Sequence, residues 1–233
     1  ETVIEVNPRA SRTIPFLSKC IGNSLAKIAS KVITGKSLKD LGLEAEIMPT
    51  NYAVKAPVFP FNKFRKVDPI LGPEMKSTGE VMGRGDCFGE AFGKAMKGAG
   101  EVIPNQGRVF VSVKDNDKKY LPDLCSKLEK LGFQIYATKG TAKALEKSDV
   151  KVKIVNKVLE GRPHIVDAIL NKEIDMIINT TEGRQSIKDS FSIRRSALEH
   201  SIFLTTTISG GFAIVESLEK GVENWDYKPL QLS

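Results

Sequence analysis

Residues 107–142 read "GRVFVSVKDNDKKYLPDLCSKLEKLGFQIYATKGTA", and this stretch decides the fold. Two short apolar runs rich in β-formers, 108–113 and 133–138, predict strands. The residues between them have helical periodicity over about 118–131. Because two strands joined by such a helix run parallel, the stretch predicts a βαβ unit.

The same alternation continues towards the end of the chain. Three further strands are predicted, at "VKIVN" (152–156), "DMIINT" (175–180) and "IFLTTT" (202–207). The accompanying helices are predicted at about 140–147, 164–172, 186–199 and 211–220. Five strands alternating with helices predict an α/β fold, a Rossmann-like domain over 107–221 with a five-stranded parallel sheet covered on both faces. Ligands of such domains bind at the carboxyl ends of the strands.

Polar side chains gather at these predicted carboxyl ends. They are hydroxyls, amides and lysines, namely Thr138, Thr141, Asn156, Lys157, Asn179, Thr180, Thr181 and Thr206, with Lys118 beyond the first strand. Such groups at one sheet edge are typical of a site for a phosphorylated small molecule. The alternative is that they are ordinary helix caps and strand ends. His164 is the one candidate acid–base group near a strand end, and we expect it in the first turn of a helix, so the sequence indicates binding rather than reaction.

Residues 1–98 follow a different pattern. The predicted elements are a strand at 2–6, helices at about 13–21 and 24–34, a strand-like piece at 51–61, a Pro- and Gly-rich loop at 69–85 and a helix at 86–98. Ser24 and Asp86 are the expected N-caps. Because these pieces hold too few strands to close a sheet, we interpret them as the end of a larger domain; a small α+β domain is the alternative. Residues 99–106 are interpreted as a linker and 222–233 as a surface tail.

The opening "ETVIEVNPRASR" ends its predicted strand in a carboxylate, an amide and two guanidinium groups. Strand alternation sends Glu5 and Asn7 to one face. Their oxygens could hold Mg²⁺ when nucleotide phosphates supply further ligands, and Arg9 and Arg12 could reach phosphate oxygens. A solvated strand end is the alternative. Since the chain starts within a strand and without Met, we expect the natural protein to extend upstream.

Composition excludes several classes of protein. The net charge of +7, the apolar fraction of 41% and the charged fraction of 27% are typical of a soluble globular protein. Neither a membrane-spanning apolar run nor a signal peptide is visible, so we expect no membrane partner. Three scattered cysteines, Cys20, Cys87 and Cys125, indicate reduced thiols and a cytoplasmic location. Two histidines argue against a zinc site. Without a basic run interleaved with aromatics, nucleic acid is not an expected partner.

Motifs along nearly the whole chain resemble those of one family. They are "IEVNPRASRTIPFLSK", "FPFNKF", "DPILGPEMKSTGEVMG", "NKVLEGRPHI", "INTTEGR" and "SIRRSAL". Together they resemble the large chain of carbamoyl phosphate synthetase, and E-x-N-P-R resembles the last metal-binding segment of ATP-grasp enzymes. The resemblance implies an ATP-dependent ligase that makes carbamoyl phosphate from glutamine-derived ammonia, bicarbonate and two ATP, for arginine and pyrimidine biosynthesis, together with a smaller glutaminase subunit.

The resemblance divides the chain into two parts. Residues 1–98 resemble the C-terminal part of the second ATP-grasp unit, which phosphorylates carbamate. In the family, positions matching Glu5 and Asn7 bind the Mg²⁺ or Mn²⁺ of ATP, and those matching Arg9 and Arg12 lie near the phosphates. Residues 107–221 resemble its allosteric domain, which is similar in fold to methylglyoxal synthase and often contacts its own copies. There the family binds a nucleotide effector, UMP or IMP, through positions matching Lys118, Thr138, Thr141, Lys157, Asn179, Thr181 and Ser190.

Three positions depart from the family pattern. Ala56 replaces a glutamate and Leu204 a tyrosine that belong to the ornithine site, so we hypothesise that ornithine does not activate this protein; activation in an assay of the full enzyme would contradict this. Lys139 stands where the family often has His. A stand-alone methylglyoxal synthase is one rival function, but "GRPH" (161–164) lacks the aspartate that would act as its base. An isolated nucleotide-binding module without catalysis is the other.

Overall fold

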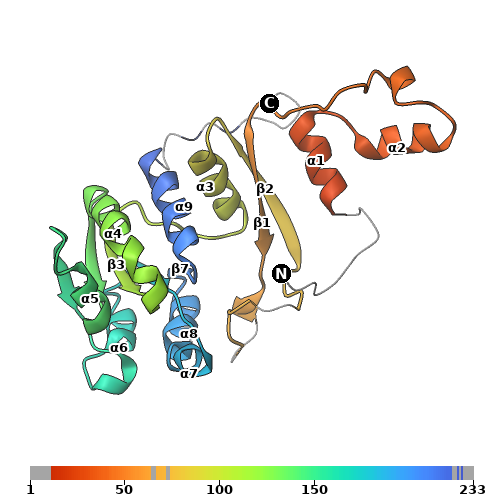
Figure 1. The fold of residues 1–233 in the computed structure, drawn as a ribbon. Coiled ribbons are helices and arrows are strands. Elements are labelled where there is room, and N and C mark those ends of the chain that lie inside the picture. The colour runs from red at the N-terminus through yellow and green to blue at the C-terminus, as the bar shows by residue number, and fades with distance from the viewer. Residues whose placement is uncertain (1–11, 64–66, 72–73, 222–224, 226, 228–233) are drawn as a thin grey trace.

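The computed structural model describes residues 12–63, 67–71, 74–221, 225 and 227 (Figure 1). A helix-covered sheet forms one side of the molecule, and a two-stranded hairpin extends beside it, with two further helices near the end of the hairpin (Figure 1). The strand predicted at 2–6 lies outside the described residues.

The larger sheet has five parallel strands, as the sequence predicts, and their order is β5-β4-β3-β6-β7. Its strands are β3 (Gly107–Ser112), β4 (Phe133–Ala137), β5 (Val152–Ile154), β6 (Met176–Asn179) and β7 (Phe203–Thr205). The chain first builds outwards from β3 to β5 and then returns to the other side of β3 to place β6. This reversal makes a topological switch point at the carboxyl ends of β3 and β6, which is where ligands of open α/β sheets bind.

The helices of this part confirm the predicted alternation with three adjustments. They are η3 (Asp115–Tyr120), α4 (Leu121–Lys130), α5 (Lys139–Leu145), η4 (Val158–Glu160), α6 (Ile165–Leu170), α7 (Arg184–Asp189), α8 (Phe191–Glu199) and α9 (Ile208–Glu219). The single helix predicted at 186–199 is two helices that meet at Ser190, whose φ of −90° and ψ of 0° interrupt regular geometry. The helix predicted from 118 begins at Leu121 after a 3₁₀ turn, with Pro122 in its first turn. The last helix begins at Ile208 instead of 211.

Each face of this sheet carries its own apolar core. Val109 and Val111 point into one core with Leu124 and Leu128 of α4. Phe110, between them in sequence, points into the other core, which α6 and α8 cover. This alternation within one strand follows from the two-residue period of a β-strand. Because both faces are buried, the strands read as near-continuous apolar runs.

The N-terminal part contains more strand than the sequence predicts. Its elements are α1 (Thr13–Ile21), α2 (Leu25–Ile33), η1 (Lys39–Leu41), β1 (Tyr52–Val58), η2 (Phe61–Lys63), β2 (Gly79–Gly85) and α3 (Phe88–Gly98). The predicted loop at 69–85 therefore ends in a strand, and β2 pairs antiparallel with β1. Gly83 and Gly85 lie in this strand. Both positions need glycine because a Cβ at either of them would overlap the backbone of Ala91 in α3.

Of the two N-caps predicted in this part, Ser24 is confirmed and Asp86 is wrong. The Ser24 side chain accepts a hydrogen bond from the Lys27 amide at the start of α2, as predicted. Asp86 is not the cap of α3, because the N-cap position is Cys87. The Asp86 carboxylate instead accepts a hydrogen bond from Asn51 Nδ2, at 2.9 Å, next to the hairpin.

Helices α3 and α9 pack closely and join the two parts of the molecule. A Cβ at Gly89 would overlap the Glu216 carbonyl, and one at Gly93 would overlap the side chains of Ser217 and Trp225. Trp225 is buried, so the expected surface tail at 222–233 contributes at least one ring to the core. Figure 1 shows α3 between α9 and the hairpin.

Candidate functional site

A cavity of about 340 Å³ opens at the switch point of the five-stranded sheet. It lies where β3 and β4 end, between the loops that follow β3, β5 and β6. Its walls carry three lysines, two carboxylates and several hydroxyls, and the lining residues are Ser112, Val113, Lys114, Asp115, Lys118, Thr138, Gly140, Thr141, Lys157, Glu182 and Ser186. Four predicted effector contacts, Lys118, Thr138, Thr141 and Lys157, are thus brought together.

Two threonines form the inner wall of the cavity. Thr138 and Thr141 are only 2% and 1% exposed. The Thr138 hydroxyl donates to Thr141 Oγ1 at 3.2 Å, and the Val113 amide donates to the same oxygen at 3.4 Å. These bonds tie the end of β4 and the start of α5 to the end of β3. The threonines therefore hold a fixed position at the buried end of the cavity.

The lysines of the cavity interact with an exposed carboxylate. Lys118 Nζ lies 2.7 Å from Asp115 Oδ1, and the Asp115 side chain is 92% exposed. The hydrogen bond and charge of Lys118 hold the pKa of Asp115 below its ordinary value of 3.8, and the charge of Lys157 lowers it further. Asp115 is therefore ionised at neutral pH. The charges of Lys118 and Lys157 both act on the Asp115 carboxylate, so a dianionic phosphate could replace this carboxylate beside the two lysines.

The segment after β6 closes the remaining side. Thr180 Oγ1 accepts a hydrogen bond from the Lys114 amide at 3.0 Å, and the Thr180 amide donates to the Ser112 carbonyl. Glu182 and Ser186 from this segment line the cavity. These bonds attach the loops after β3 and β6 to each other.

Three predicted effector contacts are not among the lining residues. Asn179 is 1% exposed, and its Nδ2 donates to the Ser112 carbonyl at 3.3 Å. Thr181 is half-buried in the neighbouring loop. Ser190 lies at the junction of α7 and α8, where its amide donates to the Ser186 carbonyl. Direct contact of these residues with a ligand stays a prediction.

Several lining residues were missed in the sequence. Ser112 is the last residue of β3, and Lys114 and Asp115 come after it, whereas Glu182 and Ser186 follow β6. Both strands flank the switch point, so the order of the strands was the signal that could have found them. The sequence patterns indicate hydroxyls, amides and lysines at the strand ends, but they do not show which two strands lie side by side at the reversal.

Candidate groups for acid–base or nucleophilic chemistry have structural roles. His164 is the N-cap of α6, where its Nδ1 accepts a hydrogen bond from the Asp167 amide at 3.3 Å and its own amide donates to the Asp167 carboxylate. Burial raises the pKa of Cys125 to about 12, so this thiol is protonated at neutral pH. Neither residue lines the cavity. The walls are suited to binding an anion.

Of the four residues predicted to bind the metal ion and phosphates of ATP, only Arg12 is among the described residues. Glu5, Asn7 and Arg9 lie outside the described residues, and Arg12 is exposed just before α1. Across the described ranges no group of three or more His, Cys, Asp or Glu residues is placed to hold a metal ion. The metal and ATP assignments therefore stay predictions.

A second cavity, of about 290 Å³, lies at the opposite end of the sheet. Its walls come from the segments that precede β3, β6 and β7, including Val102, Ile174 and Ile202. Lys172 and His200 also line it. With fewer cations and more apolar wall, it is the weaker candidate for an anion.

Among the helices that the structure describes, none is both long and apolar enough to cross a membrane.

Comparison with known proteins gives two results. Residues 121–206, from the start of α4 to the residue after β7, match the family described as the MGS-like domain. The carbamoyl phosphate synthase large chain of Pseudomonas putida is 63% identical over 221 residues, which is 95% of this chain and 21% of the relative. That of Pseudomonas aeruginosa is 59% identical over the same shares, and that of Halomonas eurihalina is 54% identical over 94% of this chain and 21% of the relative.

These relatives are much longer than this chain, which spans about a fifth of their length. The family match includes α5 and the loop after β6, both of which contribute walls to the cavity. Residues 121–206 therefore match the MGS-like domain, and the chain is similar, over 95% of its length, to part of the carbamoyl phosphate synthase large chain of Pseudomonas putida.

Proposed function

We propose that this chain is the C-terminal portion of a glutamine-dependent carbamoyl phosphate synthetase large chain, and that residues 107–221 are its nucleotide-binding allosteric domain. The observation that carries the proposal is the cavity at the switch point, which Lys118 and Lys157 line together with Thr138 and Thr141. The similarity to carbamoyl phosphate synthase large chains over 95% of the chain supports the same assignment.

The phosphate of a nucleotide monophosphate suits this cavity better than a neutral ligand. Lysines and hydroxyls bind phosphate oxygens through charge-assisted hydrogen bonds. The exposed carboxylate of Glu182, which also lines the cavity, could accept hydrogen bonds from ribose hydroxyls. We propose UMP or IMP as the effector, and phosphate as the part of it that the lysines recognise.

Calorimetric titration with UMP and IMP tests this assignment. We expect binding by the unmodified chain and much weaker binding of uridine, which lacks the phosphate. Lys118→Ala should weaken UMP binding by about 1.5–3 kcal/mol, and Thr138→Ala by about 0.5–1.5 kcal/mol. Lys119→Ala is the matched control, since this neighbouring lysine is exposed and its Nζ lies over the Tyr120 ring instead of lining the cavity. Equal binding of UMP and uridine would contradict the proposal.

We further propose that residues 1–98 belong to the ATP-grasp unit that phosphorylates carbamate. Glu5 and Asn7 would bind the Mg²⁺ or Mn²⁺ of ATP, and Arg9 and Arg12 its phosphates, in a cytoplasmic enzyme that works with a small glutaminase subunit. The complete enzyme would use ammonia from glutamine, bicarbonate and two ATP, and its allosteric domains would contact one another.

The 233-residue chain alone should not make carbamoyl phosphate. It spans 21% of the length of its relative in Pseudomonas putida, and we propose that most of the ATP site lies in the rest. A radiochemical assay with ammonia, bicarbonate and ATP tests this expectation. Product above that of a heat-inactivated control would contradict it. If no product forms, a regulatory module without catalysis is the better description of this piece by itself.

A further inference from the structure

The Arg194 guanidinium is fully buried and bonded on two sides. Its Nε and Nη2 donate to the two carboxylate oxygens of Asp68, at 2.8 and 2.6 Å. Nη2 also donates to the Ile187 carbonyl at 2.7 Å. The side chain is 0% exposed. A buried guanidinium needs such a paired, hydrogen-bonded carboxylate, so the position of each group depends on the others.

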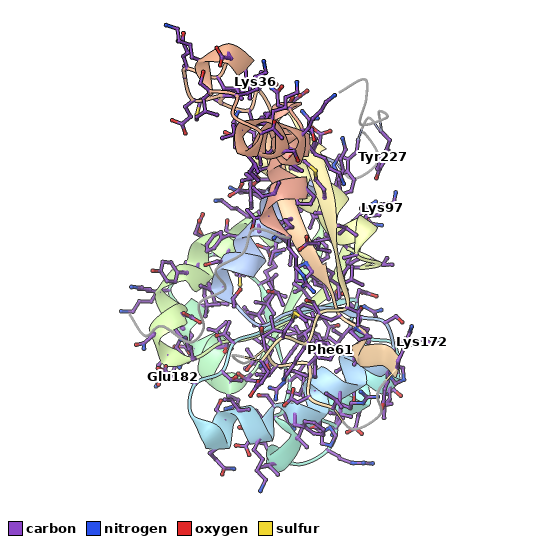
Figure 2. The ribbon with its side chains drawn as sticks, turned by 90° about the vertical axis from the view of Figure 1, so that its right-hand side faces the viewer. Lys36, Phe61, Lys97, Lys172, Glu182 and Tyr227 are labelled. Carbon is purple, nitrogen blue, oxygen red and sulfur yellow. The ribbon has the colours of Figure 1, made fainter. Side chains whose placement is uncertain are left out.

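The two partners of Arg194 belong to different parts of the molecule. Asp68 lies in the long connection between β1 and β2, where its Oδ1 also accepts a hydrogen bond from the Ile70 amide at 3.2 Å. Ile187 lies in α7 and follows Ser186, which lines the anion cavity. Phe61, which Figure 2 labels, lies in η2 of the same connection, and η2 contacts α8.

Backbone bonds connect Arg194 to the cavity a second time. The Arg194 amide donates to the Ser190 carbonyl, and the Ser190 amide donates to the Ser186 carbonyl. Residue Ser186 is thus held through Ile187 by the side chain and through Ser190 by the main chain. A displacement of the guanidinium would move the α7 wall of the cavity.

We infer that Arg194 is a positioning residue of the anion cavity, and that its ion pair with Asp68 couples ligand binding there to the packing of the β1–β2 connection. The identity of the ligand rests on the proposed function, whereas the coupling rests on the bonds of Arg194. Coupling of this kind is reciprocal. Binding of the ligand should therefore stabilise residues 67–71, and removal of the Asp68 charge should weaken binding of the ligand.

Asp68→Asn tests whether the charge of Asp68 supports ligand binding, because asparagine keeps the shape of the side chain and removes its charge. We expect it to weaken UMP binding at least fivefold in calorimetry, although Asp68 does not line the cavity. Asp175→Asn is the matched control. Asp175 is paired with Arg108 at the other end of the sheet, at 3.0 Å, and its side chain is 34% exposed against 29% for Asp68. The control should change UMP binding less than twofold, and Asp68→Glu should recover part of the loss.

Hydrogen exchange on the unmodified chain tests whether ligand binding stabilises residues 67–71, and it needs no variant. Saturation with UMP should slow exchange of the Ile70 amide and its neighbours. Unchanged exchange at Ile70, or UMP binding by folded Asp68→Asn at the wild-type affinity, would overturn this inference and leave the proposed function intact. Failure of the unmodified chain to bind UMP would overturn both.

Discussion

Asp115 is the residue whose role in the cavity can be tested most simply. Its carboxylate holds Lys118 at 2.7 Å, and Lys118 keeps its pKa below 3.8. A phosphate that binds to Lys118 must compete with this negative charge. Asp115→Asn should therefore tighten binding of inorganic phosphate and UMP by about two- to fivefold.

The gain from Asp115→Asn should be the same at pH 7 and pH 8.5. A depressed pKa keeps the carboxylate ionised at both values, and its competition is lost only as the pH falls through that pKa. Calorimetry at the two pH values measures it, with Asp123→Asn as control because Asp123 pairs with Lys127 away from the cavity. Weaker UMP binding by Asp115→Asn would show instead that the carboxylate contacts the ligand.

The sequence identifies the cavity residues that carry chemistry at a strand end. Thr138 ends a predicted strand, Thr141 and Lys157 each follow one, and all three were found that way. Glu182 and Ser186 were not, because they lie several residues beyond β6 and reach the cavity only through the path of the loop. A loop path depends on long-range contacts such as the Lys114–Thr180 hydrogen bond, which local sequence patterns do not contain.

At the scale of elements, glycines were the main source of error. Glycine clusters usually indicate loops, which is why β2 was missed. In β2 and α3 they serve close packing instead: Gly83 lies under Ala91, and Gly93 lies under Ser217 and Trp225. The strand–helix alternation of 107–221 was predictable because buried parallel strands leave apolar runs that helical segments separate.

Gly93→Ala should destabilise the packing of α3 on α9. The added methyl overlaps the Ser217 side chain and the Trp225 ring, and overpacking of this kind costs about 1–3 kcal/mol. Gly98→Ala is the control on the same helix, because its methyl would meet Val81 at an ordinary 3.6 Å. Gly98→Ala should leave the free energy of unfolding unchanged or raise it by up to about 1 kcal/mol.

Urea unfolding of the two glycine variants measures this difference. A Gly93→Ala variant as stable as the unmodified chain would show that α3 and α9 can separate without loss. The same measurement reports on Trp225, because its fluorescence follows burial against α3.

For the whole molecule, the central claim is that the switch-point cavity binds a nucleotide through its phosphate. Among the described residues, two cavities lie at opposite ends of one sheet, and of these two only the first gathers Lys114, Lys118 and Lys157. The Arg194–Asp68 pair and the α3–α9 contact join this domain to the N-terminal hairpin. Through these contacts, ligand binding at the cavity would reach the N-terminal part of the chain.

The most direct test is a titration of the ¹⁵N-labelled chain with UMP, followed by amide chemical shifts. The account predicts the largest shifts at Lys114–Lys118 and Thr138–Thr141, and their loss in Lys118→Ala but not in Lys119→Ala. Largest shifts around Lys172 and His200, at the second cavity, or equal shifts with uridine, would contradict it.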